Sequence, residues 1–238
     1  MGTLINAAAI IVASILGVIF KKGLPEKIQK GIMFVLGLGL VALTLGWFLK
    51  DFLVINPLTG TTTTRNDLLI IISLVVGIMI GEWIDIDFRL NQWAFNIEKK
   101  FNLPPLAKGF IAGTLIFCVG AMAIVGSLQD GLYGDMTTLL IKSTLDFITA
   151  LILASVLGIG VIFSAVSVLI YQGAITLFAQ GATSFMTIDM IAGISMVGNI
   201  ILIAIGINFM EIKKIKVANM LPALIIPIIY FLIIGWIN

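Results

Sequence analysis

The chain has 238 residues, of which 60% are hydrophobic and 11% are charged. Soluble domains carry roughly a quarter charged residues, so this composition excludes a soluble globular protein. Lysine and arginine number 14 against 12 acidic residues, which leaves no strongly basic face for nucleic-acid binding. Histidine is absent and Cys118 is the single cysteine, which excludes an intrachain disulfide, histidine-based catalysis and a Cys/His metal cluster.

Apolar stretches follow one another along the whole chain. Each is close to the roughly 20 helical residues that cross a bilayer. Gly158 and Gly160 divide the longest stretch in two. The sequence therefore predicts an all-α, polytopic membrane protein with about eight spans, near residues 2–20, 29–49, 67–84, 108–128, 138–158, 161–180, 188–209 and 217–237.

The connection between the third and fourth spans has a helical pattern of its own. Apolar residues recur there at helical spacing, namely Leu90, Trp93, Ala94, Ile97 and Phe101. This pattern predicts an amphipathic helix near residues 88–101 in the cytoplasmic membrane interface, ended by Pro104 and Pro105. A solvated linker is the alternative interpretation.

Basic residues test the span count, because short cytoplasmic loops are enriched in lysine and arginine. Eleven of the fourteen fall in three connections, those after the first, third and seventh spans. Lys50, Arg65 and Lys142 are the exceptions. The first span is followed, not preceded, by lysines, which is the reverse of a signal peptide, so we expect it to stay. Eight spans with both termini outside the cytoplasm fit this distribution.

An internal repeat is visible in the sequence. Residues 2–20 align without a gap with residues 143–161 at seven identical positions, and residues 67–78 match residues 189–200 at five. Since four spans per copy preserve orientation, we expect two parallel repeats, residues 1–137 and 138–238, related by an axis along the membrane normal.

Small residues four apart recur in both copies and predict close helix packing. They are Ala9, Ala13 and Gly17 in the first span and Ala150, Ala154 and Gly158 in the fifth. We expect these two spans to touch at the centre. The alternative is that small residues mark any buried helix, and Gly77 and Gly81 of the third span allow the same two interpretations.

Asp146 is the leading candidate for a functional group inside the membrane, because a buried carboxylate needs a partner or a wet cavity. Its equivalent place in the first span lies within one residue of Asn6, so the two side chains are predicted to line one cavity. The alternative is a simple ion pair with Lys142, one turn earlier.

Further polar side chains extend the candidate site. Gln172 and Asn199 lie deep in the sixth and seventh spans, where amides bind a solute or tie helices together. Gln129 and Asp130 follow a glycine-rich part of the fourth span, which predicts a span broken before the interface or, alternatively, an Asp-Gly turn. Glu82 and Asn208 lie at near-equivalent places in the third and seventh spans and form a second polar layer or, alternatively, simply mark helix ends. Asn219 precedes the eighth span, where an N-terminal cap is the simpler interpretation.

Four segments carry a resemblance to a known family: GTLINAAA, FCVGAMAIVGSLQDGLYGD, KSTLDFITA and VANMLPAL. In this order they resemble the bacterial inner-membrane family catalogued as domain of unknown function 554, of the YdfK and YqgA type. The resemblance covers essentially the whole chain. It implies a multi-pass protein of the bacterial cytoplasmic membrane and implies no reaction.

Two functional hypotheses follow. The first is a small secondary transporter or channel-like permease, in which Asp146 and Asp130 bind a cation or proton and the amides line the path. The predicted substrate-binding residues are Asn6, Gln129, Asp130, Asp146, Gln172, Asn199 and Asn208. The second is a non-transporting scaffold, assembly factor or sensor.

We expect no enzymatic activity and no cofactor, since the sequence offers no GxSxG elbow and no clearly paired catalytic carboxylates. It assigns no metal. The expected partners are the lipid bilayer, an ion or small polar solute, and a second copy of the chain in a homo-oligomer.

Overall fold

The computed structural model describes the chain except for residues 22–24, 57, 102–104, 180–185 and 238. Of the predicted helix-ending prolines, Pro104 therefore lies outside the described residues, as does Lys22 among the basic residues. The elements in chain order are α1 (Gly2–Lys21), α2 (Glu26–Phe52), β1 (Leu53–Ile55), β2 (Thr62–Thr64), α3 (Asp67–Ile84), α4 (Ile86–Phe101), α5 (Ala107–Cys118), α6 (Ala121–Tyr133), α7 (Thr137–Leu157), α8 (Gly160–Leu177), α10 (Ile188–Phe209), η1 (Val217–Leu224) and α11 (Ile225–Ile237).

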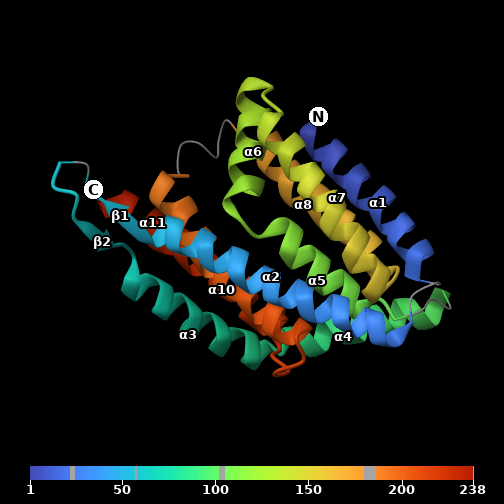
Figure 1. Ribbon diagram of the computed structural model, residues 1–238. Coiled ribbons are helices and arrows are strands. Elements are labelled where there is room, and N and C mark those ends of the chain that lie inside the picture. The colour runs from blue at the N-terminus through green and yellow to red at the C-terminus, as the bar shows by residue number, and fades with distance from the viewer. Residues whose placement is uncertain (22–24, 57, 102–104, 180–185, 238) are drawn as a thin grey trace. The chain divides into compact units, whose positions relative to one another are not determined.

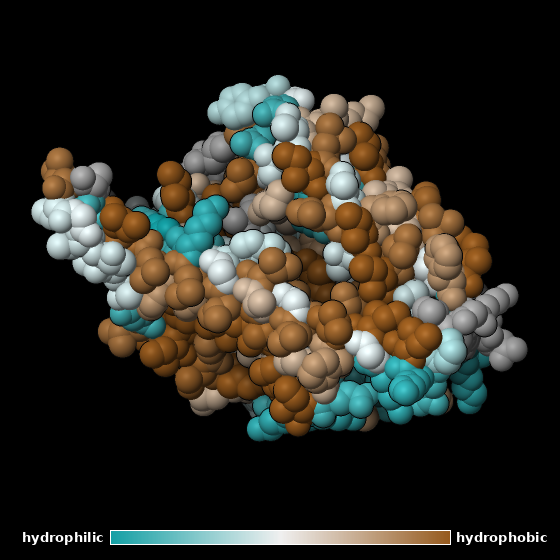
Figure 2. All heavy atoms as spheres, in the orientation of Figure 1, coloured by the Kyte–Doolittle hydropathy of each residue, from teal (hydrophilic) through white to brown (hydrophobic). Residues whose placement is uncertain are grey.

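The predicted all-α polytopic fold is confirmed. Within the described residues, seven helical segments are long and apolar enough to cross a membrane, and the bent pair of α5 and α6 brings the number to eight. A two-stranded antiparallel hairpin, β1 with β2, pairs Leu53 with Thr64 between α2 and α3. In Figure 2 hydrophobic side chains cover most of the visible surface of the helices, as lipid contact requires.

The fourth span is broken within the glycine-rich segment 117–135, for which a break was predicted. α5 ends at Cys118, α6 begins at Ala121, and the two helices are bent by 61°. Gly120 between them has φ 131° and ψ 150°, a conformation that only glycine adopts without strain. The predicted broken span is confirmed, whereas the alternative, a turn at Asp130 and Gly131, is wrong, because both residues belong to α6, and that helix is closed by Gly134 with φ 66°.

The last span begins with a turn-rich segment rather than an α-helix. The 3-10 helix η1 contains Pro222, which has no N–H for an α-helical ladder. η1 packs on α3 at its two glycines: a Cβ on Gly81 would lie 1.8 Å from the Asn219 carbonyl oxygen, and one on Gly77 would lie 2.4 Å from Ala223. Close packing is therefore the correct interpretation of these glycines.

The chain forms two compact units, and each combines segments from both halves of the sequence. Unit 1 contains residues 1–33 and 88–184, and unit 2 contains residues 34–87 and 185–238. The predicted repeats, residues 1–137 and 138–238, divide the sequence differently from these two units. The division into repeats stays a prediction. The proposed equivalents α1 and α7 both lie in unit 1, and α3 and α10 both lie in unit 2.

Unit 1 is centred on α1, which packs along α7 and also contacts α8 and α6 (Figure 1). Ala13, Ala150 and Ala154 are fully buried, and a Cβ on Gly17 would lie 2.3 Å from the Leu151 carbonyl oxygen. The predicted contact between the first and fifth spans is confirmed. Gly158 differs from its counterpart Gly17, because it ends α7 with φ 81° instead of continuing the helix.

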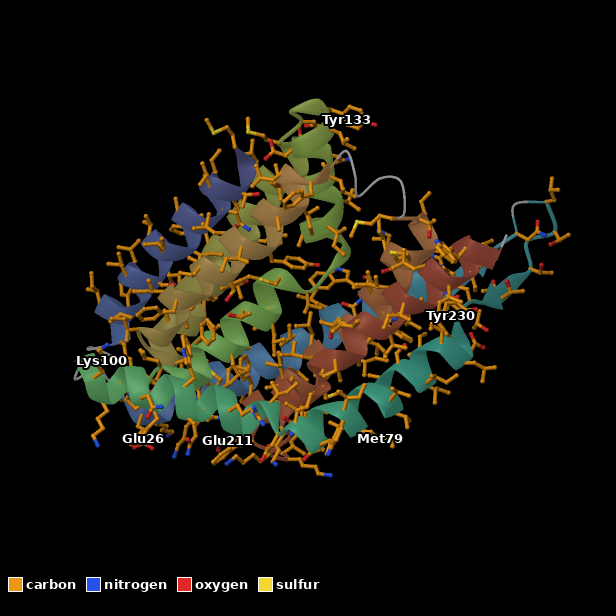
Figure 3. All side chains as sticks on the ribbon, turned by 180° about the vertical axis from the view of Figure 1, so that it is seen from behind. Glu26, Met79, Lys100, Tyr133, Glu211 and Tyr230 are labelled. Atoms are coloured by element: carbon orange, nitrogen blue, oxygen red, sulfur yellow. The ribbon has the colours of Figure 1, made fainter. Side chains whose placement is uncertain are left out.

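The predicted helix near residues 88–101 is α4. In unit 1 it is anchored by Ala94, which is 2% exposed, and by a ring contact of Trp93 with Phe110 of α5, with centroids 5.8 Å apart. Figure 2 shows hydrophilic side chains gathered along it, and Figure 3 places Lys100 of α4 and Tyr133 of α6 at opposite ends of the unit. Its position in the membrane interface stays a prediction.

Unit 2 has α10 as its most buried helix. α2 and α10 approach at two glycines, because a Cβ on Gly37 would lie 2.5 Å from the Gly206 carbonyl oxygen. Ile70 of α3 and Met196 of α10 are buried in one hydrophobic cluster. Near the hairpin, Arg65 pairs with Asp189 at 3.2 Å and so joins the starts of α3 and α10.

Candidate functional site in unit 1

Buried polar side chains gather where α1, α6, α7 and α8 meet in unit 1. All are at most 9% exposed: Thr3, Asn6, Ser127, Asp130, Lys142, Ser143, Asp146 and Gln172. Burying so many polar groups is costly unless they have partners, so their contacts decide what the cluster can do.

Asp146 lies at the centre of this cluster. Its carboxylate pairs with the ammonium of Lys142 on the same helix and accepts a hydrogen bond of 3.0 Å from Asn6 Nδ2 of α1. The side chains of Lys142 and Asp146 are only 8% and 9% exposed. Both predicted geometries are therefore present together: the ion pair within α7, and the meeting of Asn6 with Asp146.

Gln172 brings α8 into the same group. Its Oε1 accepts a long hydrogen bond of 3.4 Å from Asn6 Nδ2, and both amides are fully buried. Asn6 reaches this place because it lies on the buried face of α1, one turn before the fully buried Ile10. We call Asn6, Lys142, Asp146 and Gln172 the central cluster.

The central cluster has hydrogen-bonding capacity that the protein does not use. Asn6 Oδ1 and Gln172 Nε2 are buried and find no partner among the described residues, and the same holds for Ser127 Oγ of α6. Unpaired buried polar atoms are rare in folded proteins, and each costs about 1–3 kcal/mol. An acceptor and a donor held open beside a charged pair are what a bound ion, water or solute would satisfy.

Asp130 also lies in unit 1, but it anchors helices instead of joining the central cluster. Its Oδ2 accepts from the backbone N–H of Gly2 at 3.0 Å and pairs with the Met1 amine at 2.9 Å. A carboxylate at a helix N-terminus satisfies free N–H groups and complements the helix dipole. The carboxylate thus anchors α1 to α6, and Thr3 and Thr176 add a weak contact of 3.4 Å between α1 and α8.

The remaining predicted site residues lie apart from the central cluster and are engaged locally. Gln129 Oε1 accepts from Thr138 Oγ1 at 2.7 Å across the turn from α6 to α7. In unit 2, Asn199 Nδ2 donates to Ser195 Oγ one turn earlier at 3.4 Å. Asn208 bonds both backbone groups of Ile215, at 2.8 and 2.7 Å, and so closes the loop after α10.

Asn219 was predicted to cap its own helix, and this is wrong, because η1 begins without a side-chain cap. Instead, Asn219 Oδ1 accepts from the backbone N–H of Asp87 in the first turn of α4, at 2.7 Å. The side chain is fully buried, and its Nδ2 has no partner. A contact between segments 132 residues apart leaves no trace in local sequence pattern.

Two further residues of unit 1 were not among the predicted site residues. Ser127, one turn before Asp130, belongs to the buried face of α6. Cys118 ends α5, a helix that packs against α7. The spacing of Ser127 and Asp130 does indicate that both lie on one face of a helix. Only the fold shows that this face packs against α7 and α8.

Charges at and beyond the end of α3 form a separate group in unit 2. Lys216 pairs with Asp85 at 3.3 Å and with Glu82 at 3.5 Å. The hydrogen bond to Asp85, with the charges of Asp85 and Glu82, raises the pKa of Lys216. Burial raises the pKa of Asp87 nearby. No three Cys, Asp or Glu side chains within the described ranges are placed to hold a metal ion.

These features define a polytopic all-α membrane protein with a charged cluster buried in one of its two units. Residues 1–232 match the family described as protein of unknown function, DUF554, and the chain belongs to this family.

Two curated relatives extend over nearly the whole chain. The uncharacterized membrane protein YdfK of Bacillus subtilis (strain 168) is 36% identical over 234 residues, which is 98% of this chain and 96% of that protein. The uncharacterized protein YqgA of Escherichia coli (strain K12) is 30% identical over 233 residues, with 95% and 94% covered. No solved structure matches the chain.

Proposed function

We propose that this protein is a small secondary transporter or channel-like permease for an ion or a small polar solute. The observation that carries the proposal is the central cluster: an oppositely charged pair and two amides, contributed by α1, α7 and α8, buried among helices of membrane-spanning length. Ionisable groups at such depth are expensive and typically mark a substrate or ion pathway.

The broken span next to the cluster supports the same function. Transporters often place their site at a discontinuous helix, where backbone groups released by the break face a polar interior. Here the two helices that flank the break, α5 and α6, both pack against α7, which carries Lys142 and Asp146. No phosphate-binding loop occurs in the sequence, so the drive for transport is a gradient or a partner.

The structure narrows the set of residues that we propose for the site. Asn6, Asp146 and Gln172 form it, with Lys142 as the counter-charge. Asp130 and Gln129 act as supports, since both are engaged in holding α1 and the turn after α6. Asn199 and Asn208 are engaged within unit 2 and are not part of our proposal.

The membrane and topology that we propose follow the charge distribution. The protein lies in the bacterial cytoplasmic membrane with both termini outside the cytoplasm, and α4 lies in the cytoplasmic interface. The connections rich in lysine and arginine after α1, α3 and α10 face the cytoplasm, in accord with the positive-inside rule. We also propose that the chain forms homo-oligomers and has no enzymatic activity.

The test is flux through purified protein in liposomes. Entrapped dyes report proton and alkali-ion movement, and light scattering reports entry of glycerol and urea. We expect at least one probe to cross faster than in empty liposomes, and Asp146→Asn or Gln172→Leu to abolish that flux. Asp135→Asn is the matched control, because Asp135 is exposed and bonds only its own turn, at Thr137.

A non-transporting scaffold, assembly factor or sensor is the second candidate. Its support is that several polar side chains serve packing alone, such as the half-buried Asn208 on Ile215 and the buried Asp130 on Gly2. This candidate predicts that no probe crosses and that Asp146→Asn changes only stability. Flux that survives Asp146→Asn and Gln172→Leu would remove the central cluster from the permease mechanism.

A further inference from the structure

We propose that the ammonium group of Lys142 occupies the place of a small monovalent alkali cation at Asp146, and that the cation and the ammonium compete for this carboxylate. The inference rests on the proposed function and names the substrate class of the same site. It starts from the pair itself, which lies within one helix and is almost fully buried.

Charge balance selects a monovalent ion. Lys142 and Asp146 together are neutral, and they are the only two charged side chains in the central cluster. If a second positive charge joined them, the buried site would carry an uncompensated charge, which is strongly unfavourable in a low dielectric. If the ammonium withdraws and an ion of charge +1 takes its place, neutrality is kept. A divalent ion would need a further carboxylate.

The available ligand atoms suit an alkali ion. Hard cations prefer carboxylate and amide oxygens. The Asp146 carboxylate is one source, and Asn6 Oδ1 is a buried oxygen without a partner on the side chain that already contacts Asp146. Gln172 Oε1 makes only the single long bond of 3.4 Å to Asn6. Gln172 Nε2, a donor, would bind a water molecule of the ion rather than the ion.

The position of the two partners on one helix makes the exchange mechanically simple. Lys142 has a flexible four-carbon stem and a compact charge, so its ammonium can leave without moving α7. Asp146 meanwhile keeps its bond from Asn6 across α1. The exchange therefore changes side-chain positions within a fixed helix pair, which packs through Gly17 and the alanines described above.

The experiment is a thermal unfolding series in detergent, in which choline chloride is replaced by lithium, sodium or potassium chloride at constant ionic strength. Removal of the ammonium in Lys142→Gln leaves Asp146 without its cation. We expect its Tm to rise saturably with one alkali ion, by roughly 5–10 °C at a hundredfold excess over the Kd. Wild type should show a smaller rise, because Lys142 competes.

Three further variants keep the test decisive. Lys142→Gln/Asp146→Asn should lose the ion dependence. Lys21→Gln is the matched control, since this lysine lies in unit 1 and donates to the Val156 carbonyl at 2.8 Å, outside the cluster. If Lys142→Gln does not fold in any salt, Asn6→Asp in the wild-type background gives the site net negative charge, and its Tm should rise in the same ion.

The proposal is overturned if both Lys142→Gln, where folded, and Asn6→Asp unfold at the same temperature in choline and in every alkali salt. The outcome is separable from that of the flux test. Ion-dependent Tm without flux would keep the site and remove the permease function. Flux of glycerol or urea without any ion effect on Tm would keep the permease and remove the cation.

Discussion

Units 1 and 2 bury the same kinds of polar residue but use them differently. In unit 2 the buried amides bond one turn away or at a helix end, as Asn199 does with Ser195 and Asn219 does with the start of α4. In unit 1, Asn6 of α1 donates both to the Asp146 carboxylate of α7 and to Gln172 of α8, and Lys142 pairs with the same carboxylate. The first arrangement ties backbone together, whereas the second holds charge inside the membrane.

The difference shows why a buried polar side chain is weak evidence for a site by itself. Unit 2 keeps its ion pairs at the ends of its helices, where Lys216 and Arg65 find their acidic partners. Unit 1 has an ion pair, Lys142 with Asp146, within its helices. The candidate site is therefore identified by convergence of helices and by unused bonding capacity at Asn6 and Gln172.

The largest expected effect comes from breaking the buried pair. Asp146→Ala leaves Lys142 as an unpaired buried charge and should lower the free energy of unfolding by about 3–5 kcal/mol in choline buffer. Asn199→Ala in unit 2 should cost much less, because its 3.4 Å bond to Ser195 lies within α10, and even side-chain bonds between membrane helices average only about 0.6 kcal/mol. Denaturant unfolding in detergent measures both. Equal losses would mean that the two units do not differ in the way described.

Replacing both members of the buried ion pair tests the same difference between the two units. Lys142→Met/Asp146→Leu removes both charges and should recover most of the stability lost in Asp146→Ala, since a buried pair is readily replaced by apolar side chains. Flux should remain absent. Recovered stability with recovered flux would show that the charges have no part in permeation.

Substituting glycines at helix contacts should destabilise both units, by somewhat less than breaking the buried ion pair does. Gly17→Ala places a Cβ 2.3 Å from the Leu151 oxygen, and Gly81→Ala places one 1.8 Å from the Asn219 oxygen. Overpacking of this kind costs about 1–3 kcal/mol or more. Gly173→Ala and Gly39→Ala are matched helical controls with open space at the Cβ, and they should unfold like wild type or later.

Removing the Asn208 side chain, which closes the loop after α10 in unit 2, should destabilise the protein less. Asn208→Ala removes two hydrogen bonds to Ile215, at 2.8 and 2.7 Å, and should cost about 1–2 kcal/mol. Flux should be unchanged, because the residue serves the loop after α10. A loss of flux in folded Asn208→Ala protein would return this residue to the permeation path.

The smallest effect concerns the exposed charges of unit 2. Since the pKa of Lys216 is raised by its bond to Asp85, its contribution to stability is complete below the ordinary value near 10.5 and is lost as the pH rises through the raised pKa. Lys216→Gln should therefore lower Tm slightly at pH 8, less in high salt, and should unfold like wild type in strong alkali. A Tm difference that grows with alkali would contradict this assignment.

Sequence periodicity was sufficient to predict the spans and α4, because about 20 apolar residues and a helical repeat are local properties. The meeting of Asn6 with Asp146 was also predictable, since the predicted repeat brings their places on α1 and α7 to within one residue. The partners of Asp130 and Asn219 were not, because each lies more than 120 residues away. The broken span was predictable from its glycines, but the choice of Gly120 was not, since several glycines nearby compete for the break and only packing selects one.

The most direct test of the account is whether water reaches the central cluster of unit 1 and not the interior of unit 2. Two variants are made in a Cys118→Ser background. Ser143→Cys changes the residue next to Lys142, and Ser195→Cys changes a residue of α10. The native serines are similarly buried, at 5% and 3% exposed. Intact membranes are treated with a small charged methanethiosulfonate reagent. The account predicts that the cysteine at 143 reacts and the one at 195 stays protected. Equal protection of both, or reaction at 195 alone, would contradict it.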